Sequence, residues 1–543
     1  MTEVNNAAPS VVIADGPWAQ EAGELAERLA AEAVAGELTA GNPTLWGADA
    51  ESEAAVRLAW TTLPKTSRPL LGEIAALRGE LHAEGVDRVV LAGMGGSSLA
   101  PEVITAAAGV PLTVLDTTDP GQVADALAGD LSRTVLVVSS KSGSTVETDS
   151  HRRIFEHAFE AAGIPAASRI VVVTDPESPL ETAARAAGYR HVFRADPHVG
   201  GRYSALTAFG LVPAGLAGAD VAGLLAEAAS AAPTLAQDEP DNPALRLAGA
   251  FGAALARGAE KVVFADNDSG LPGFADWAEQ LIAESTGKNG TGLLPVVVEN
   301  VSAPGFVDAG DDATTVALGS PDSAATLTVS GSLGASFLLW EYATAIAGRL
   351  LGINPFDQPD VEAAKTAARS LLDSSDGSAT PTPLLVDGPV EAYVAGSWQP
   401  PEGAGLDELI ASFVAAVPET GYLSLQAYLD REQDASAAVL RRELARNTGV
   451  QTTFGWGPRF LHSTGQYHKG GHQNGAFLQI TGAAEEDLAV PDRPYTLATL
   501  QLAQALGDGT VLADRGRPVL RLHLTDRLAG LARLAEAVQG VSR

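Results

Sequence analysis

The sequence predicts an α/β fold with two doubly wound parallel sheets of the kind found in sugar isomerases, each an α-β-α sandwich. Five short β-branched runs alternate with helical segments, at 89–92, 113–116, 134–140, 170–175 and 191–195. This spacing is typical of parallel strands joined by helices. A second series follows, with runs at 262–265, 295–300 and 326–329. Ligands of such sheets bind beyond the carboxyl ends of the strands, so the turns that follow the strands are the candidate binding sites.

The same patterns predict the domain boundaries. Residues 1–70 show mixed helical patterns and form an expected N-terminal helical segment. Residues 71–230 form the first domain, and residues 231–543 form the second domain with a C-terminal extension. Within that extension, runs at 451–454 and 476–481 resemble strands, whereas residues 373–389, rich in Ser, Asp, Gly and Pro, indicate an exposed loop.

Charge narrows the range of partners. The net charge of the 543-residue chain is −32, which argues against nucleic acid and anionic membranes, since both are bound by basic surfaces. No run is apolar enough to span a membrane, and the N-terminus lacks a signal pattern, so we expect a cytoplasmic protein. From residue 444 to 484 there are 41 consecutive residues without Asp or Glu. This stretch indicates either an anion site or a buried β-rich segment.

The turn after the first strand, GMGGSS at 93–98, is rich in glycine. Gly93 and Gly95 match a dinucleotide fingerprint, Ser98 replaces its third glycine, and Asp116 stands where a ribose-binding acid belongs. A dinucleotide-dependent dehydrogenase is therefore one alternative. Such a turn at a helix start also suits a lone phosphate or sugar hydroxyls.

The turn after the third strand carries several hydroxyl groups. Ser140, Ser142 and Thr145 lie there, and Ser144 with Glu147 fits an S-x-x-E capping box that would start a helix. The amides of the first helical turn and the positive helix end favour an anion. The turn lacks the P-loop pattern of nucleotide-binding proteins. We therefore expect it to bind a phosphate monoester.

Glu284 is the candidate base. Trp277, Leu281 and Glu284 fall at i, i+4 and i+7, so the carboxylate continues an apolar stripe toward the interior, and Gly287 is the expected end of the helix. A carboxylate held there suits proton transfer. The alternative is a structural ion pair between Glu284 and Lys288 at i, i+4.

Three further residues point to the same edge of the fold. Arg202 follows two glycines after the fifth strand, where its guanidinium could stabilise an oxyanion or form a surface ion pair. Gln358 precedes Lys365 by seven residues, about 10 Å along a helix. Because helical side chains lean toward the N-terminus, the Lys365 ammonium could converge on the same ligand as Gln358.

Five motifs, in order, resemble those of the phosphoglucose isomerase family, which is built from two sugar-isomerase domains. They are GMGGSS (93–98), SSKSGSTVET (139–148), VGGRYS (199–204), AESTGK (283–288) and NPFDQPDVEAAK (354–365). A later segment, GPRFLHSTGQYHKGG (457–471), resembles the isomerase portion of fused transaldolase/phosphoglucose isomerase proteins. The residues in front of the motifs are too few for a transaldolase barrel, so the resemblance implies only the isomerase activity.

The resemblance implies that glucose 6-phosphate and fructose 6-phosphate interconvert through a cis-enediolate. Glu284 would move the proton, Arg202 would stabilise the enediolate, and Lys365 would assist ring opening. The implied substrate-binding residues are Gly96, Ser97, Ser140, Lys141, Ser142, Thr145 and Gln358. No cofactor or metal is implied, and the expected assembly is a homodimer. A non-catalytic sugar-phosphate sensor and an isomerase acting on mannose 6-phosphate remain as alternatives.

The position of the catalytic histidine departs from the family pattern. The family places a catalytic histidine in a G-Q-H segment between the Glu284 and Gln358 motifs, where this chain has none. His468 lies beside a Gly-Gln pair in the acid-free stretch, so we predict that it opens the sugar ring. Metal binding by His462, His468 and His472 is an alternative that the neighbouring glycines disfavour, because they make a regular helix improbable.

Overall fold

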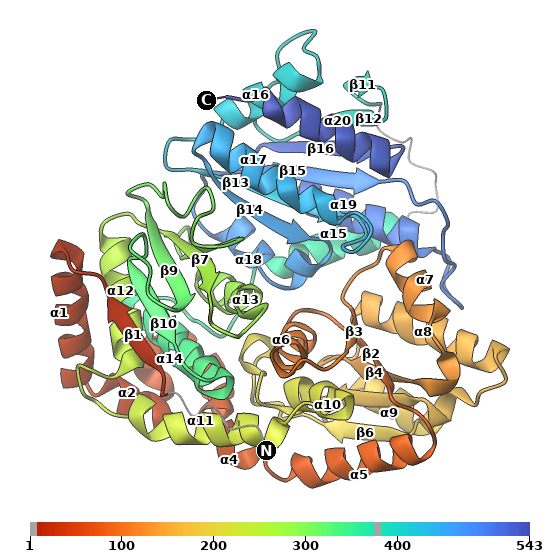
Figure 1. Cartoon of the computed structure of the whole chain (residues 1–543), viewed down its shortest axis with the longest axis horizontal. Coiled ribbons are helices and arrows are strands. Elements are labelled where there is room, and N and C mark those ends of the chain that lie inside the picture. Colours follow the sequence, from red (N-terminus) through yellow and green to blue (C-terminus); the bar gives the residue numbers. More distant parts are fainter. Residues whose placement is uncertain (1–7, 374–381, 543) are drawn as a thin grey trace.

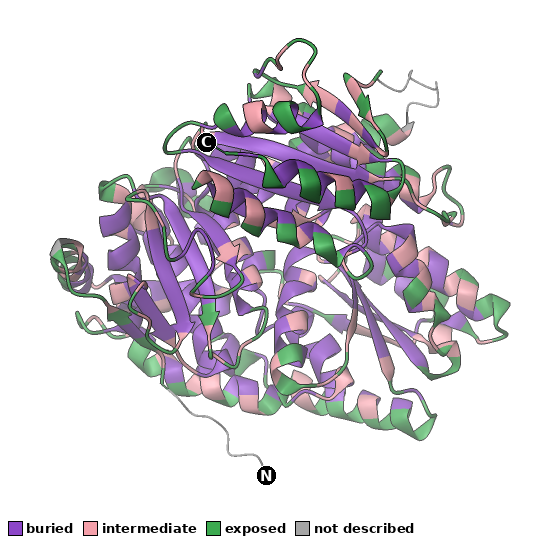
Figure 2. Ribbon diagram, turned by 45° about the horizontal axis from the view of Figure 1, so that its top comes forward, coloured by how far each residue is buried: buried purple, intermediate pink, exposed green. Residues whose placement is uncertain are grey.

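In residues 8–373 and 382–542, which the computed structural model describes, the strands form three sheets flanked by helices (Figure 1). The predicted α/β class with parallel sheets is confirmed. In Figure 2 the sheets are largely buried, while the outer faces of the helices are exposed. No helix in these two ranges is long and apolar enough to cross a membrane.

The first sheet is wholly parallel, in the order β3-β2-β4-β5-β6. Its strands match the five predicted runs: β2 (Arg88–Gly93), β3 (Thr113–Leu115), β4 (Thr134–Ser139), β5 (Ile170–Thr174) and β6 (His191–Arg194). Its helices are α5 (Leu70–Ala83), α6 (Leu99–Ala108), α7 (Pro120–Ala128), α8 (Val146–Ala161), α9 (Pro179–Ala187) and α10 (Ala208–Ala217). The strand order reverses between β2 and β4, which places the turns after these two strands side by side.

The second sheet has the order β1-β10-β9-β7-β8. Its strands are β1 (Ser10–Ile13), β7 (Lys261–Asn267), β8 (Leu294–Val298), β9 (Ala313–Gly319) and β10 (Leu327–Ser330). Its helices are α1 (Pro17–Ala31), α11 (Val221–Leu235), α12 (Pro243–Ala256), α13 (Phe274–Thr286) and α14 (Leu333–Leu351). Strand β9 was absent from our prediction.

The N-terminal segment is not wholly helical, as we had expected for residues 1–70. It contains α1, α2 (Val34–Thr39), α3 (Ala48–Ala54) and α4 (Leu63–Thr66), but β1 precedes them and pairs antiparallel with β10. This pairing covers the edge of β10, and Val11 of β1 is buried in the core. Both effects explain why the segment forms a strand.

The third sheet lies within the predicted second domain, in the order β11-β12-β16-β15-β13-β14. Its strands are β11 (Leu385–Asp387), β12 (Val390–Ala395), β13 (Tyr422–Tyr428), β14 (Gln451–Trp456), β15 (Gly475–Gly482) and β16 (Val519–Leu524). Its helices are α16 (Leu406–Ala415), α17 (Val439–Thr448), α18 (Gly465–Gly470), α19 (Leu497–Asp514) and α20 (Arg527–Gln539). The predicted loop at 373–389 falls partly outside the described residues, and its far end contains β11.

This third sheet has its own hydrophobic cluster, which includes Leu425 of β13, Leu478 of β15 and Leu534 of α20. The expected C-terminal extension is therefore a separate α/β unit. The preceding helix, α15 (Val361–Asp373), packs against α19 of this unit.

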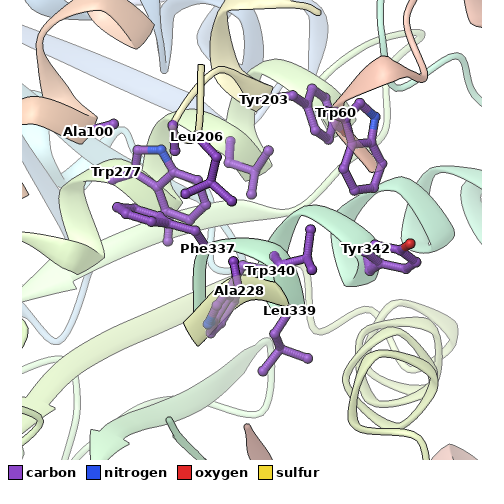
Figure 3. Packing of buried hydrophobic residues seen from close by; sticks show 14 of the residues in the cluster. Trp60, Ala100, Tyr203, Leu206, Ala228, Trp277, Phe337, Leu339, Trp340 and Tyr342 are labelled. Atoms are coloured by element: carbon purple, nitrogen blue, oxygen red, sulfur yellow. The ribbon is translucent and has the colours of Figure 1, made fainter. Parts of the chain in front are cut away.

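The first two units share one continuous core. Figure 3 shows aromatic side chains in it, among them Trp277 of α13 and Phe337 of α14. Their ring centroids lie 4.6 Å apart in an edge-to-face contact. Because Trp277 is buried in this core, it anchors α13, whose last turn carries the Glu284 carboxylate. The helix ends at Thr286, with Gly287 as its C-cap, as predicted.

Candidate active site

The hydroxyl-rich turn lies between β4 and α8. Ser140 Oγ is 3.0 Å from Thr145 Oγ1 and accepts a hydrogen bond from the Gly143 amide. Ser142 and Ser144 share a contact of 2.9 Å. Since α8 begins at Val146 without a side-chain cap, the first amides of this long helix are available to an anion.

The predicted capping box is wrong. The N-cap is Thr145, one residue after Ser144, so Glu147 is the second residue of the helix and not the third. Its side chain is buried. Glu147 Oε1 instead lies 2.9 Å from His462 Nε2, and accepts a 2.6 Å hydrogen bond from Gln504 Nε2.

The Glu147 carboxylate is ionised at neutral pH. Burial alone would raise its pKa, but the charge of His462 and the hydrogen bond from it lower the pKa from 4.5 to about 2. Gln504 is itself fixed, because its Oε1 accepts a 2.7 Å hydrogen bond from Thr118. The three groups come from the first unit (Glu147), from η8 (Arg459–His462) and from α19 (Gln504).

His462 and Lys365 face the hydroxyl-rich turn across a cavity of about 100 Å³. Lys365, on α15, pairs with Glu362 at 2.9 Å. Ser142, Thr145, Glu147 and Gln504 also line this cavity. The structure thus brings the predicted phosphate turn and the predicted lysine together.

His468, our predicted ring-opening residue, lies elsewhere. It is buried on α18 between the rings of Tyr422 and Phe477, with centroids 6.1 and 5.2 Å away. Burial, with the nearby charges of Lys469 and Arg517, lowers the pKa of His468 well below its usual range. His462 lines the cavity, whereas His468 is not among its lining residues.

A second group of residues surrounds Glu284, at the end of α13. Arg202 Nη1 lies 3.1 Å from Glu284 Oε1. The guanidinium is buried, and it also donates to Ser285 Oγ at 2.8 Å and to Gln358 Oε1 at 3.0 Å. The predicted residues Glu284, Arg202 and Gln358 therefore meet at one place.

Gln280 connects the two groups. Its Nε2 donates to Glu284 Oε2 at 3.1 Å and to the backbone oxygen of His462 at 2.8 Å. It precedes Glu284 by one helical turn, so both project from the same face of α13.

The alternative interpretation of Glu284, an ion pair with Lys288, is not what the structure shows. Lys288 Nζ lies 2.7 Å from Asp357 Oδ1 and donates to two backbone oxygens. Burial and the neighbouring charge of Arg202 lower the pKa of Lys288 to about 8.

The glycine turn serves close packing of backbones. A Cβ atom at Gly96 would collide with the backbone oxygen of Gly201, and Gly95, at φ +55°, abuts the backbone of His462. Ser97 is the last residue of the short helix η3 (Gly95–Ser97), which directly precedes α6. The turn thus brings the backbone of the first unit against the loops that carry Arg202 and His462.

Asp116 is engaged by protein groups. Its Oδ2 accepts from Arg459 Nε at 2.7 Å, and Arg431 lies 3.6 Å away. Burial alone would raise the pKa of Asp116, but the two guanidinium groups hold it below its ordinary value. A carboxylate so occupied is unavailable to a ribose, which removes the main support for a dehydrogenase.

Lys141 is the predicted substrate-binding residue that turns away. Its ammonium pairs with Asp175 at 2.6 Å. In the described part of the chain no group of three or more His, Asp and Glu side chains is arranged to hold a metal ion.

Sequence reasoning gave no role in the active site to Glu147, Gln280 or Gln504, and it named His462 only as a possible metal ligand. Glu147 had a signal, since it follows the hydroxyl-rich turn, but we assigned it to a cap. Gln280 had one as well, because it precedes Glu284 by one turn. No local pattern marks Gln504.

Comparisons with known proteins point to one family. The family model for phosphoglucose isomerase matches residues 75–316. A probable glucose-6-phosphate isomerase of Natronomonas pharaonis is 32% identical over 345 residues, which cover 53% of this chain and 80% of the relative. A glucose-6-phosphate isomerase of Synechococcus sp. is 31% identical over 368 residues, covering 54% of this chain and 68% of the relative.

Two solved structures share the fold. One, a hypothetical protein of Thermus thermophilus, has a TM-score of 0.55 and 27% identity, and covers 65% of this chain and 96% of its own. The other, a glucose-6-phosphate isomerase of Chlamydia trachomatis, has a TM-score of 0.54 and 19% identity, and covers 68% of this chain and 90% of its own. The ordered motifs, the family model and these relatives lead to one conclusion: the chain belongs to the phosphoglucose isomerase family.

Proposed function

We propose that this chain interconverts glucose 6-phosphate and fructose 6-phosphate through a cis-enediolate. The observation that carries the proposal is the Glu284 carboxylate, 3.1 Å from the buried Arg202 guanidinium and linked through Gln280 to the residues around the hydroxyl-rich turn. Aldose–ketose isomerisation needs a base, a group that stabilises an oxyanion and an anchor for the phosphate.

The phosphate binds at the start of α8. Ser140, Ser142 and Thr145 offer hydroxyl groups, and the helix N-terminus offers amides and a positive dipole end. Gly96 and Ser97 would face the sugar from the neighbouring turn. Lys141 contributes positive charge near the phosphate only after leaving Asp175.

His462 opens the pyranose ring in this mechanism. Its imidazolium form gives a proton to the ring oxygen, and Glu147 holds the imidazole in place through a 2.9 Å contact. Lys365 lies across the same cavity and assists. The cavity of about 100 Å³ is smaller than the roughly 300 Å³ of small ligand pockets. We therefore expect α15 to shift, and Lys365 to leave Glu362, when substrate binds.

Glu284 then transfers the proton along the open chain. Its carboxylate takes the C2 proton, the C2–H electron pair forms the C1–C2 double bond, and the carbonyl pair moves onto O1. Arg202 stabilises the resulting enediolate. Glu284 returns the proton to C1, a carbonyl forms at C2, and the O2 proton ends on O1. No atom is gained or lost.

A non-catalytic sensor needs the phosphate turn but has no use for the Glu284–Arg202 pair. An isomerase for mannose 6-phosphate would need the same groups, because its substrate differs from glucose 6-phosphate only in the configuration at C2. Assays of glucose 6-phosphate and mannose 6-phosphate side by side, on purified protein without added nicotinamide, distinguish these possibilities.

The decisive variant is Glu284→Gln, which keeps the side chain's shape and removes the base. We expect substrate to bind while exchange of the C2 proton with deuterated water, followed by NMR, falls by about 10²-fold or more. Glu443→Gln, which removes a carboxylate from a surface pair with Arg446, is the matched control and should exchange normally. Exchange by Glu284→Gln near the wild-type rate would place the base elsewhere.

The proposal retains the homodimer and the cytoplasmic location that we expected. Sedimentation velocity on the purified chain tests the first, and fractionation of cells that express it tests the second.

A further inference from the structure

One face of the third sheet is polar where a packed sheet is ordinarily apolar. Alternate residues point to opposite faces of a strand. The apolar face bears Leu478 of β15 and Leu520 of β16, which pack in the cluster with α20. The opposite face bears Gln479 of β15 and Arg521 of β16, and both are buried.

These polar residues form a row across four strands. Tyr393 of β12 is directly paired with Arg521, Arg521 with Gln479, and Gln479 with Gln426 of β13. The Gln479 amide donates to Gln426 Oε1 at 3.1 Å. Burying a row of polar side chains costs desolvation free energy, so we expect these side chains to have a binding or structural role.

A cavity of about 530 Å³ opens over this row. Helix α19 contacts β12, β15 and β16 and forms one wall with Leu506 and Thr510, and Trp398 forms part of another. This volume lies within the roughly 300–1,000 Å³ of small-molecule sites. Arg521 is the one charged side chain among the described residues that line it.

The charge of Arg521 is incompletely matched. Only 8% of the residue is exposed, and its guanidinium lies over the Tyr393 ring, 3.9 Å from the centroid. In residues 8–373 and 382–542 no carboxylate forms an ion pair with it within 4.0 Å. The charge of Glu391, on the neighbouring strand, acts on Arg521 from farther away, and this carboxylate accepts a 2.6 Å hydrogen bond from the Tyr393 hydroxyl. Buried guanidinium groups ordinarily have an anionic partner.

We propose that this cavity is a second binding site, for a small organic anion whose carboxylate or phosphate pairs with Arg521. The body of the ligand lies along Trp398 and Leu506. The Gln479 amide group donates to Gln426 and to the backbone oxygen of Ala505, so its Oε1 is left to accept from a donor group on the ligand. Because Arg521 is a single cation, we expect the ligand to carry one anionic group. The aromatic and aliphatic walls favour a ligand whose remaining part is apolar or ring-shaped.

The site is separate from the one that holds Glu147 and His462, but α19 belongs to both. Gln504 and Leu500 of this helix line the catalytic cavity, whereas Leu506, Gly509 and Thr510 line the second one. Gln426 also lies 3.4 Å from His468 Nδ1, on the helix that follows His462. A ligand that shifts α19 would therefore move Gln504.

The test uses three probes of one shape: benzoate, phenyl phosphate and neutral benzyl alcohol. Binding to the full chain is followed by calorimetry and by Trp398 fluorescence, with Trp398→Phe to assign the signal. We expect at least one anion to bind with a Kd of about 1 mM or lower, and benzyl alcohol about tenfold more weakly or worse. The tighter of the two anions identifies the preferred group.

Arg521→Gln should weaken anion binding about tenfold or more, to the level of benzyl alcohol. Thr510→Trp, which fills the cavity from α19 without touching the charge, should abolish binding of all three probes. Arg446→Gln, on the surface of the same unit, should leave binding of all three probes unchanged. Ser142→Ala, in the phosphate turn, should leave binding of benzoate and benzyl alcohol unchanged. Circular dichroism checks that each variant folds.

Equal binding of benzoate and benzyl alcohol overturns the proposal, as does unchanged anion binding by folded Arg521→Gln. Absence of anion binding to the wild-type chain up to about 10 mM, a free energy weaker than about −3 kcal/mol, overturns it as well. Loss of phenyl phosphate binding in Ser142→Ala alone would assign that probe to the phosphate turn.

Discussion

Replacing Glu147 by Gln removes one negative charge from a buried site and leaves its shape intact. In the folded chain the pKa of Glu147 falls from 4.5 to about 2, because the charge and hydrogen bond of His462 outweigh the opposing effect of burial. At about 1.4 kcal/mol for each tenfold change in the proton equilibrium, the stabilisation is up to about 3 kcal/mol.

The sign follows from linkage. A carboxyl group whose pKa is lower in the folded chain stabilises it fully above the unfolded pKa of 4.5, and this stabilisation is lost as the pH falls from 4.5 toward 2. The Glu147→Gln chain lacks it at every pH. The two chains should therefore differ most near neutral pH and converge in acid.

The assay is urea unfolding of both chains between pH 7 and pH 3. We expect a stability difference of up to about 3 kcal/mol at pH 7 that narrows below pH 4.5. Glu443→Gln, which removes a partly exposed carboxylate paired with the exposed Arg446, should cost no more than about 1 kcal/mol. A difference for Glu147→Gln below about 0.5 kcal/mol at pH 7, or one that does not narrow in acid, would refute the reasoning.

Two further predictions concern the site. Replacing Ser142 and Thr145 by Ala should raise KM by about tenfold or more and change kcat little, because phosphate contacts are made equally in the ground and transition states; an unchanged KM in steady-state assays would contradict the phosphate assignment. His462→Asn should slow turnover of cyclic glucose 6-phosphate by about 10²-fold or more while sparing an open-chain substrate, and His468→Asn should not distinguish the two forms. Rates measured on both forms check this, and the reverse pattern would restore His468 as the residue that opens the ring.

Much of the fold was predictable because its signals are local. The five strands of the first sheet are short β-branched runs between helical segments, a local pattern that is typical of buried parallel strands. The same holds for the end of α13 at Gly287, where the change from an apolar stripe to glycine stops a helix. The meeting of Arg202, Glu284 and Gln358 was also foreseeable, since each follows a strand or ends a helix at the same edge of a parallel sheet.

By itself, then, the sequence determined the parallel sheets, the hydroxyl-rich turn before α8 and the family to which the chain belongs. Only the tertiary structure decided which histidine faces the cavity. His462 and His468 are six residues apart in one acid-free stretch, and that stretch is largely buried in β14, α18 and β15. Packing against Tyr422 and Phe477 turns His468 inward, while docking of the third unit on the first brings His462 to Glu147. Glu147 and Gln504 are 357 residues apart, and no local pattern encodes a contact that forms only when separate units pack together.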